Sequence, residues 1–307
     1  MALAGTRQAL EASDGSFPVY TNRKVINNDP TMAELADSGL INVNNNWRKV
    51  PDGSVVIFSA HGVPPSFHEI AEQRHLLTVD LTCQLVTRVH HIAIEAEREG
   101  KYIIYAGVSG HPETVGVMGE IKPENITLVE TLDDAKRVII PEGRVAMLLS
   151  QTTLSTAELL EIFDFFSKNE RVEIPNRWDI CPTTDLNQKA VDELIKSYGI
   201  DFLLVQGSPD SHNTEQLRRM AEKSGIPSAK IDTTDDMQRV WFTSGIRRVG
   251  FTSGASVEDK LSEPVFEWFR REGIEPIDLM EGEKREKQFK LPEQDLQKLR
   301  ERAKVTI

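Results

Sequence analysis

Short apolar runs alternate with amphipathic segments along most of this chain of 307 residues. Each apolar run has the length of a strand, and each is followed by a polar loop and then by a helical pattern of apolar positions. The six clearest runs are VVIFSA, LLTVDL, YIIYAG, VAMLLS, DFLLVQ and RRVGFT. Because strands that alternate with helices build parallel sheets, the pattern predicts an α/β fold with mostly parallel sheets.

The strand–helix units group into three stretches of roughly 100 residues, which is a usual domain size. We therefore expect a first α/β domain over residues 1–83, a second over 84–180 and a third over 181–272. Residues 273–307 are rich in charge, and we interpret them as a solvated C-terminal segment.

Composition and charge narrow the class of protein. Hydrophobic residues make up 39% of the chain, which is enough for a buried core. The 48 acidic residues exceed the 36 basic ones, and the net charge of −12 disfavours binding to nucleic acid or to an anionic membrane. The sequence has neither a signal-peptide pattern nor an apolar run of about 18 residues. We expect a cytoplasmic protein without a nucleic-acid or membrane partner.

Cys83 and Cys181 are the two cysteines of the chain, and each stands between an apolar run and a helical pattern. They lie too far apart in the sequence for a zinc knuckle or a CxxC redox pair. In a reducing compartment such cysteines are thiols or metal ligands rather than a disulfide. Soft thiolates suit iron, so the two residues indicate an iron–sulfur cluster or no shared site at all.

Polar residues with acid–base or hydrogen-bonding chemistry follow three of the apolar runs. They are His61, His111 with Glu113, and Thr152 with Thr153. A single loop histidine is most often solvated, but several strand ends that converge on one volume indicate a site. Glu113 is the natural acid or base, and Thr152 could orient it through its hydroxyl group, although QTTLST also fits a helix cap.

Two further loops carry short hydroxyl and amide side chains at predicted helix starts. Ser208, Ser211, His212, Asn213 and Thr214 follow the run DFLLVQ, and Ser253 and Ser256 follow RRVGFT. Such donors at a helix N-terminus suit a phosphate or diphosphate. Each loop alone is equally explained as a turn and cap, but two of them favour a shared oxyanion ligand.

Six motifs, in order, resemble the signature loops of the LytB/IspH family of 4-hydroxy-3-methylbut-2-enyl diphosphate reductases. They are SAHGVPP, DLTCQLVTRVH, GHPETVGVMGE, SQTTLS, GSPDSHN and GASVEDKL. The resemblance implies three similar α/β domains around a central cavity, with an iron–sulfur cluster held by one cysteine from each domain. It also implies removal of an allylic hydroxyl group from a diphosphate substrate, with two electrons and with protons delivered by a Glu–Thr network.

The motifs carry the family's roles onto residues of this chain. The resemblance implies catalytic roles for Glu113, Thr152 and His111, and metal ligation by Cys83 and Cys181. The implied substrate pocket contains His61, His111, Asn27, Ser211, His212, Asn213 and Ser256.

This chain departs from the family pattern at several of these positions. Leu3 stands where the family has its first cluster cysteine, and leucine cannot ligate iron. Asn27 replaces a pocket histidine, His212 replaces one of two adjacent pocket serines, and Asn187 replaces an arginine. We therefore expect a 4Fe–4S cluster that is labile or altered, and an anion pocket with changed selectivity.

The leading hypothesis is an iron–sulfur reductase that removes a hydroxyl group from a small anionic, diphosphate-like substrate. An external donor such as ferredoxin or flavodoxin would supply its electrons. A divergent enzyme with another substrate, or with non-redox Lewis-acid chemistry on the cluster, is an alternative. A second alternative is a cluster-free protein that binds a phosphorylated metabolite.

Overall fold

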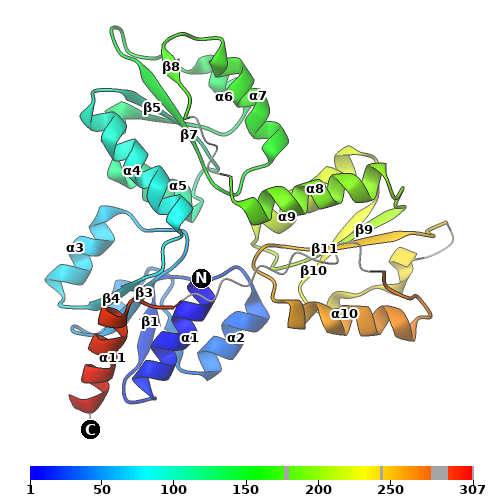
Figure 1. Ribbon diagram of the computed structural model, residues 1–307, viewed down its shortest axis with the longest axis horizontal. Helices are drawn as coiled ribbons and strands as arrows, with labels where there is room; N and C mark the ends of the chain where they lie inside the picture. Colours follow the sequence, from blue (N-terminus) through cyan, green and yellow to red (C-terminus); the bar gives the residue numbers. More distant parts are fainter. Residues whose placement is uncertain (176–179, 243–244, 278–289, 306–307) are drawn as a thin grey trace. The chain divides into compact units, whose positions relative to one another are not determined.

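The computed structural model describes residues 1–175, 180–242, 245–277 and 290–305, and its strands form three parallel sheets (Figure 1). Contacts divide the chain into two compact units. The first comprises Met1–Ile26, Glu34–Cys181 and Phe289–Ile307, and contains two of the sheets. The second comprises Asn27–Ala33 and Pro182–Gln288, and contains the third sheet.

The first sheet has the strand order β2-β1-β3-β4. Its strands are β1 (Val19–Thr21), β2 (Leu40–Asn42), β3 (Val55–Phe58) and β4 (Leu77–Asp80), and the helices of this region are α1 (Ala2–Ser13), α2 (Asp29–Asp37) and α3 (Pro65–Gln73). Val56 and Phe58 of β3 pack with Tyr20 of β1 and Ala71 of α3. The alternation of side chains along β3 thus places an apolar face beneath α3.

The C-terminal segment differs from the expected solvated tail. Residues Glu293–Val305 form helix α11, which packs against α1, and the side chain of Leu299 is fully buried. Charged residues cover the outer side of this helix, so composition alone conceals its apolar contact. Residues 278–289 and 306–307 of the predicted segment lie outside the described residues.

The second sheet has the order β6-β5-β7-β8 and is covered on both faces (Figure 1). Its strands are β5 (Tyr102–Ala106), β6 (Ile126–Val129), β7 (Ala146–Ser150) and β8 (Val172–Glu173), and its helices are α4 (Gln84–Arg98), α5 (Pro112–Glu120), α6 (Leu132–Arg137) and α7 (Thr156–Ser167). Ile103 and Tyr105 of β5 pack towards α4 and α5, whereas Ile104 and Ala106 pack towards α6 and α7. Burial on both faces explains why β5 reads as a continuous apolar run.

The third sheet, in the second unit, has the order β10-β9-β11. Its strands are β9 (Phe202–Gln206), β10 (Ser228–Ile231) and β11 (Val249–Ser253), and the helices are α8 (Pro182–Lys196), α9 (His212–Lys223) and α10 (Asp259–Arg271). Leu203 and Val205 pack against α8 and α9, and Phe202 and Leu204 face the side of α10.

The predicted α/β fold with three parallel sheets is confirmed, and all six apolar runs form strands. The pattern did not identify β1, β2, β6, β8 and β10, which are short or carry few apolar residues. The expected domain limits after residues 83, 180 and 272 stay a prediction. No described helix is both long enough and apolar enough to cross a membrane.

Candidate functional site

The loops that carry Cys83 and His61 lie together at the carboxyl end of the first sheet. Strands β3 and β4 are neighbours in that sheet, so the loops that follow them start at the same edge. Cys83 is the N-cap of α4, and its backbone N–H donates a hydrogen bond of 3.0 Å to the carbonyl oxygen of Ala60. The backbone of Cys83 thus contacts Ala60, the residue that precedes His61.

His61 is a half-buried, neutral histidine. Its Nδ1 atom lies 3.4 Å from Oγ of Ser59. Burial, and then the charge of Arg23, lowers the pKa of His61 from 6.5 to about 4. At neutral pH the imidazole therefore carries no charge and has one N–H group to donate.

His111 links His61 to the next strand end. The two rings meet edge to face, with centroids 5.7 Å apart. His111 is buried at the N-cap of α5, and its Nδ1 atom accepts a hydrogen bond of 3.2 Å from the backbone N–H of Glu113. An accepting Nδ1 places the proton of a neutral ring on Nε2. The structure thus brings together the two histidines that the sequence analysis singled out.

Glu113 and Thr152 form a buried pair. The side chain of Glu113 is 1% exposed. Its Oε1 atom accepts a hydrogen bond of 2.6 Å from the backbone N–H of Thr152, and its Oε2 atom accepts one of 3.1 Å from Oγ1 of Thr152. Burial and the charge of Glu113 raise the pKa of Tyr105, which indicates that this carboxyl group lies in a weakly solvated environment.

The sequence analysis offered two roles for the QTTLST segment, and both are present. Thr152 contacts Glu113, whereas the side chain of Ser155 caps α7 by accepting a hydrogen bond from the backbone N–H of Glu158. The orienting hydrogen bond and the helix cap therefore come from different residues of one loop.

Cys181 completes this set of contacts. Its backbone N–H donates a hydrogen bond of 2.8 Å to the carbonyl oxygen of Thr152. A continuous path of contacts therefore runs from the Cys83 loop through His61, His111, Glu113 and Thr152 to Cys181. Both cysteines are free and partly buried.

The donor set fits an iron–sulfur cluster in part. Two unpaired thiols at the ends of one polar network are suitable ligands for iron. Leu3, at the position of the family's first cluster cysteine, is a half-buried residue of α1 and offers no donor. No group of three His, Cys, Asp or Glu side chains suited to a metal ion occurs among the described residues. At the three cluster positions of the family pattern, this chain therefore has two thiols and one leucine.

The loop before α9 holds the remaining predicted residues of the second unit. Ser211 caps α9, its Oγ atom accepting a hydrogen bond of 3.3 Å from the backbone N–H of Thr214. Asn213 is buried, and neither polar atom of its amide has a hydrogen-bond partner among the described residues. The hydroxyl groups of Ser208 and Thr214 are likewise buried and unpartnered within that part of the chain.

Asn27 and Ser256 also meet in the second unit. The Oγ atom of Ser256 donates a hydrogen bond of 2.9 Å to the backbone carbonyl of Asn27. His212 is exposed at the first position of α9, and desolvation together with Arg219 lowers its pKa. Asn187, at another divergent position, donates from Nδ2 to the carbonyl oxygen of Ser253 at 2.9 Å.

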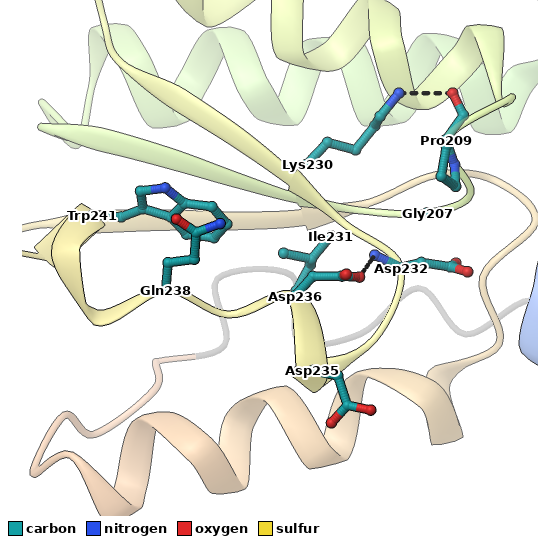
Figure 2. Close-up of a pocket in the computed structure, with 9 residues that line it drawn as sticks. All are labelled: Gly207, Pro209, Lys230, Ile231, Asp232, Asp235, Asp236, Gln238 and Trp241. Carbon is teal, nitrogen blue, oxygen red and sulfur yellow. Dashed lines mark hydrogen bonds between the residues drawn. The ribbon is translucent and has the colours of Figure 1, made fainter.

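A pocket of about 340 Å³ lies beside the same loop but contains none of the predicted site residues (Figure 2). Its wall carries Asp232, Asp235 and Asp236 together with Trp241. The Lys230 ammonium group at its rim donates a hydrogen bond of 2.8 Å to the carbonyl oxygen of Pro209. Three carboxylates disfavour a diphosphate, so we do not assign the anion site to this pocket.

The sequence analysis missed two residues near the network of the first unit. His90 is not among the candidate residues of the sequence analysis, yet it is buried and its Nδ1 atom lies 2.9 Å from Oε1 of Glu120. Arg23 was not considered, although it follows β1 and its charge acts on His61. A positive residue directly after a strand was the available signal.

Comparisons with known proteins agree with the motifs. The family model "LytB protein" matches residues 1–270. A 4-hydroxy-3-methylbut-2-enyl diphosphate reductase of Streptomyces coelicolor is 36% identical over 98% of this chain and 88% of its own length. The enzyme of that name from Pseudomonas aeruginosa is 35% identical over 95% of this chain and 94% of its own length.

Solved structures lead to the same family. The E-1-hydroxy-2-methyl-but-2-enyl-4-diphosphate reductase of Plasmodium falciparum has a TM-score of 0.84 and 25% identity, and the match covers 97% of this chain and 95% of that one. A (E)-4-hydroxy-3-methyl-but-2-enyl diphosphate reductase, described as the terminal enzyme of the non-mevalonate pathway, has a TM-score of 0.58 and 26% identity over 87% of this chain and 95% of that one. Ordered motifs, sequence and fold together show that this chain belongs to the LytB/IspH family of reductases.

Proposed function

We propose that this protein is an iron–sulfur reductase that removes a hydroxyl group from a small diphosphate, of the kind named for its relatives. The observation that carries the proposal is the buried Glu113–Thr152 pair, joined through backbone contacts and the two histidines to the loops of both cysteines. Solvated loop residues would not require such a connected set.

Cys83 and Cys181 would hold the cluster, with Leu3 leaving one family ligand position without a thiolate. When bound, the cluster would supply electrons, received from an external donor such as ferredoxin or flavodoxin, and an open iron site that can bind oxygen. Fewer thiolates weaken the attachment of the cluster, so we infer that it is more labile than one held by three cysteines.

Glu113 would deliver the proton that converts the departing hydroxyl group into water. A carboxyl group that is 1% exposed transfers protons without competition from bulk solvent. Thr152 holds both oxygens of this group through its N–H and Oγ1. The same hydroxyl can pass a proton between the carboxyl group and the substrate, since a hydroxyl both donates and accepts.

Two sets of residues, each within its own unit, carry groups that suit a diphosphate. In the first unit, His61 is a neutral N–H donor, and His111 lies beside it at the edge of the Glu113 network. In the second unit, the unpartnered amide of Asn213 and the N-terminus of α9 favour an anion, as do the neighbouring Ser211, Asn27 and Ser256. His212 and Asn27, which replace family residues, would alter the selectivity for the anion.

A single-turnover assay tests this proposal. The chain is purified without oxygen, reduced chemically, and mixed with 4-hydroxy-3-methylbut-2-enyl diphosphate, and the dehydroxylated products are measured. We expect products in the wild type and almost none in Glu113→Gln, whereas Glu95→Gln on the exposed side of α4 should match the wild type. Equal product from Glu113→Gln would reject the assigned proton donor.

A second candidate function is binding of a phosphorylated metabolite without a cluster. Leu3, together with the lack of a three-ligand metal group among the described residues, favours it. This candidate predicts that Cys83→Ser and Cys181→Ser bind diphosphates as tightly as the wild type. Loss of binding on substitution of either cysteine would reject it.

A further inference from the structure

Arg23 is a partly buried cation, and no described residue serves as its counterion. Its guanidinium group makes no hydrogen bond or ion pair with any described residue. Burial lowers the pKa of Arg23, and no neighbouring carboxylate acts to raise it. A desolvated charge without a partner is costly for the folded protein, so its retention needs an explanation.

Other partly buried arginines of the chain do have partners. Arg74, whose side chain is 27% exposed, donates to Asp52 and to two backbone carbonyls. Arg218, at 24%, forms ion pairs with Glu215 and Glu222. These two partly buried guanidinium groups are thus paired with carboxylates, whereas that of Arg23 is not paired with any described residue.

The backbone around Arg23 is held firmly beside His61. Oδ1 of Asn22 accepts a hydrogen bond of 3.1 Å from the backbone N–H of Ser59, which ties this loop to the one that carries His61. Oγ1 of Thr21 donates to the carbonyl oxygen of Arg23 at 2.8 Å. These contacts fix the main chain and leave the guanidinium group available.

The surroundings of Arg23 suit an oxyanion. His61 is close enough for the charge of Arg23 to act on it, and His111 follows at 5.7 Å between ring centroids. The imidazole of His61 is neutral, so Arg23 supplies the fixed positive charge of this group. A planar guanidinium group can donate two parallel hydrogen bonds to a phosphate, which an imidazole cannot.

We propose that Arg23, with His61 beside it, binds a phosphate group of the substrate and is a determinant of specificity in this chain. The identity of the ligand rests on the proposed function, whereas the existence of the site rests on the unpaired, partly buried guanidinium group. This residue would provide cationic recognition in a chain that has Asn27 in place of a family histidine.

Binding of inorganic pyrophosphate to the full-length chain, purified without oxygen, tests the proposal. Calorimetry should show that Arg23→Gln weakens binding by about 10- to 100-fold, as expected for loss of charge-assisted hydrogen bonds. Arg23→Lys keeps the charge but loses the two parallel N–H donors of the guanidinium group, so we expect an intermediate loss of affinity. Arg98→Gln, which removes an exposed arginine at the end of α4, should bind as the wild type does.

Thermal unfolding separates binding from a structural role. Without pyrophosphate, Arg23→Gln should unfold at the wild-type temperature or above it, because the substitution removes an unpaired charge. Addition of pyrophosphate should then stabilise Arg23→Gln less than it stabilises the wild type.

Three results would overturn the proposal: no pyrophosphate binding by the wild type, binding by Arg23→Gln within twofold of the wild type, or a destabilised Arg23→Gln with an undiminished response to pyrophosphate. The single-turnover assay is read separately. Arg23-dependent pyrophosphate binding in a chain without turnover would reject the reductase proposal and keep this site. Turnover in a chain whose pyrophosphate binding does not depend on Arg23 would keep the reductase proposal and reject this site.

Discussion

The Glu113–Thr152 pair and the loop before α9 both contain buried polar groups, but they differ in whether those groups have hydrogen-bond partners. Both oxygens of Glu113 accept hydrogen bonds from Thr152. In the α9 loop, the amide of Asn213 and the hydroxyl group of Ser208 are buried without a partner among the described residues. The first arrangement is satisfied by described residues, whereas the second leaves buried polar atoms that suit a ligand.

The difference has an energetic meaning. Each buried polar group without a partner costs about 1–3 kcal/mol, and a satisfied one contributes modestly to stability. Removal of a group from the Glu113 pair should therefore harm the free protein, and removal of one from the α9 loop should harm the complex. Stability and ligand binding can thus be measured on the same variants to separate the two regions.

Substitution of Glu113 should have the largest effect. Glu113→Gln preserves the shape of the pair but removes the transferable proton, so we expect turnover to fall by about 100- to 10,000-fold. The melting temperature should change little, because an amide can still bond to both groups of Thr152. Single-turnover kinetics and thermal unfolding of the same sample provide the measurement, and a decrease of less than tenfold contradicts the role.

Acid should weaken the first unit through His61. The folded chain holds the pKa of this residue at about 4, against 6.5 ordinarily, so the unfolded chain binds more protons between these values. The free energy of unfolding should therefore fall as the pH decreases from 6.5 to about 4, by about 3 kcal/mol at most. Urea unfolding across this range measures it, and His61→Gln should flatten the profile. If the free energy of unfolding of His61→Gln depends on pH as it does in the wild type, His61 is not the group responsible.

Thr152→Val should destabilise the free protein by about 1–2 kcal/mol. The substitution keeps the backbone N–H donor to Oε1 but removes the hydroxyl donor to Oε2 of a buried carboxyl group. Urea unfolding provides the value. Thr156→Val, at the start of α7, is the matched control for loss of a threonine hydroxyl, and a smaller loss in Thr152→Val than in this control counts against the paired network.

Asn213→Leu should change the free energy of unfolding of the free protein least. Any change should be a gain in stability, whereas Thr152→Val should cause a loss. Replacement of an unpartnered buried amide by an apolar side chain of similar size should leave stability unchanged or raise it by about 1 kcal/mol. Stabilisation by added pyrophosphate should decrease in this variant. Asn46→Leu, at an exposed position whose side chain makes no capping hydrogen bond, serves as the control. A clear loss of stability without ligand shows instead that the amide is satisfied in the fold.

Local patterns predicted the fold and part of the site. The apolar runs gave the central strands because burial on both faces requires continuous apolar sequence, as in β5. Parallel strand ends brought Glu113 near Thr152, as expected for loops at one edge of the second sheet. His61 and His111 also meet, but they follow strands of two different sheets, so the edge rule alone does not predict their contact. The roles of these residues stay proposals.

Other features depended on contacts that no local pattern encodes. Arg23 looks like a surface residue in the sequence, and only the loss of solvent without a gained partner distinguishes it. His90 is buried, and its Nδ1 atom contacts Glu120, thirty residues away in the sequence. Helix α11 was hidden because its many charges outnumber the few apolar residues, such as Leu299, that contact the rest of the unit.

The central claim is that Cys83 and Cys181 hold one iron–sulfur cluster. Iron and acid-labile sulfide, quantified in protein purified without oxygen and examined by EPR after reduction, test it most directly. The account predicts iron and sulfide in similar amounts and a cluster signal, both lost in Cys83→Ser and in Cys181→Ser. Colourless wild-type protein without iron under these conditions, or a cluster that survives either substitution unchanged, would contradict it.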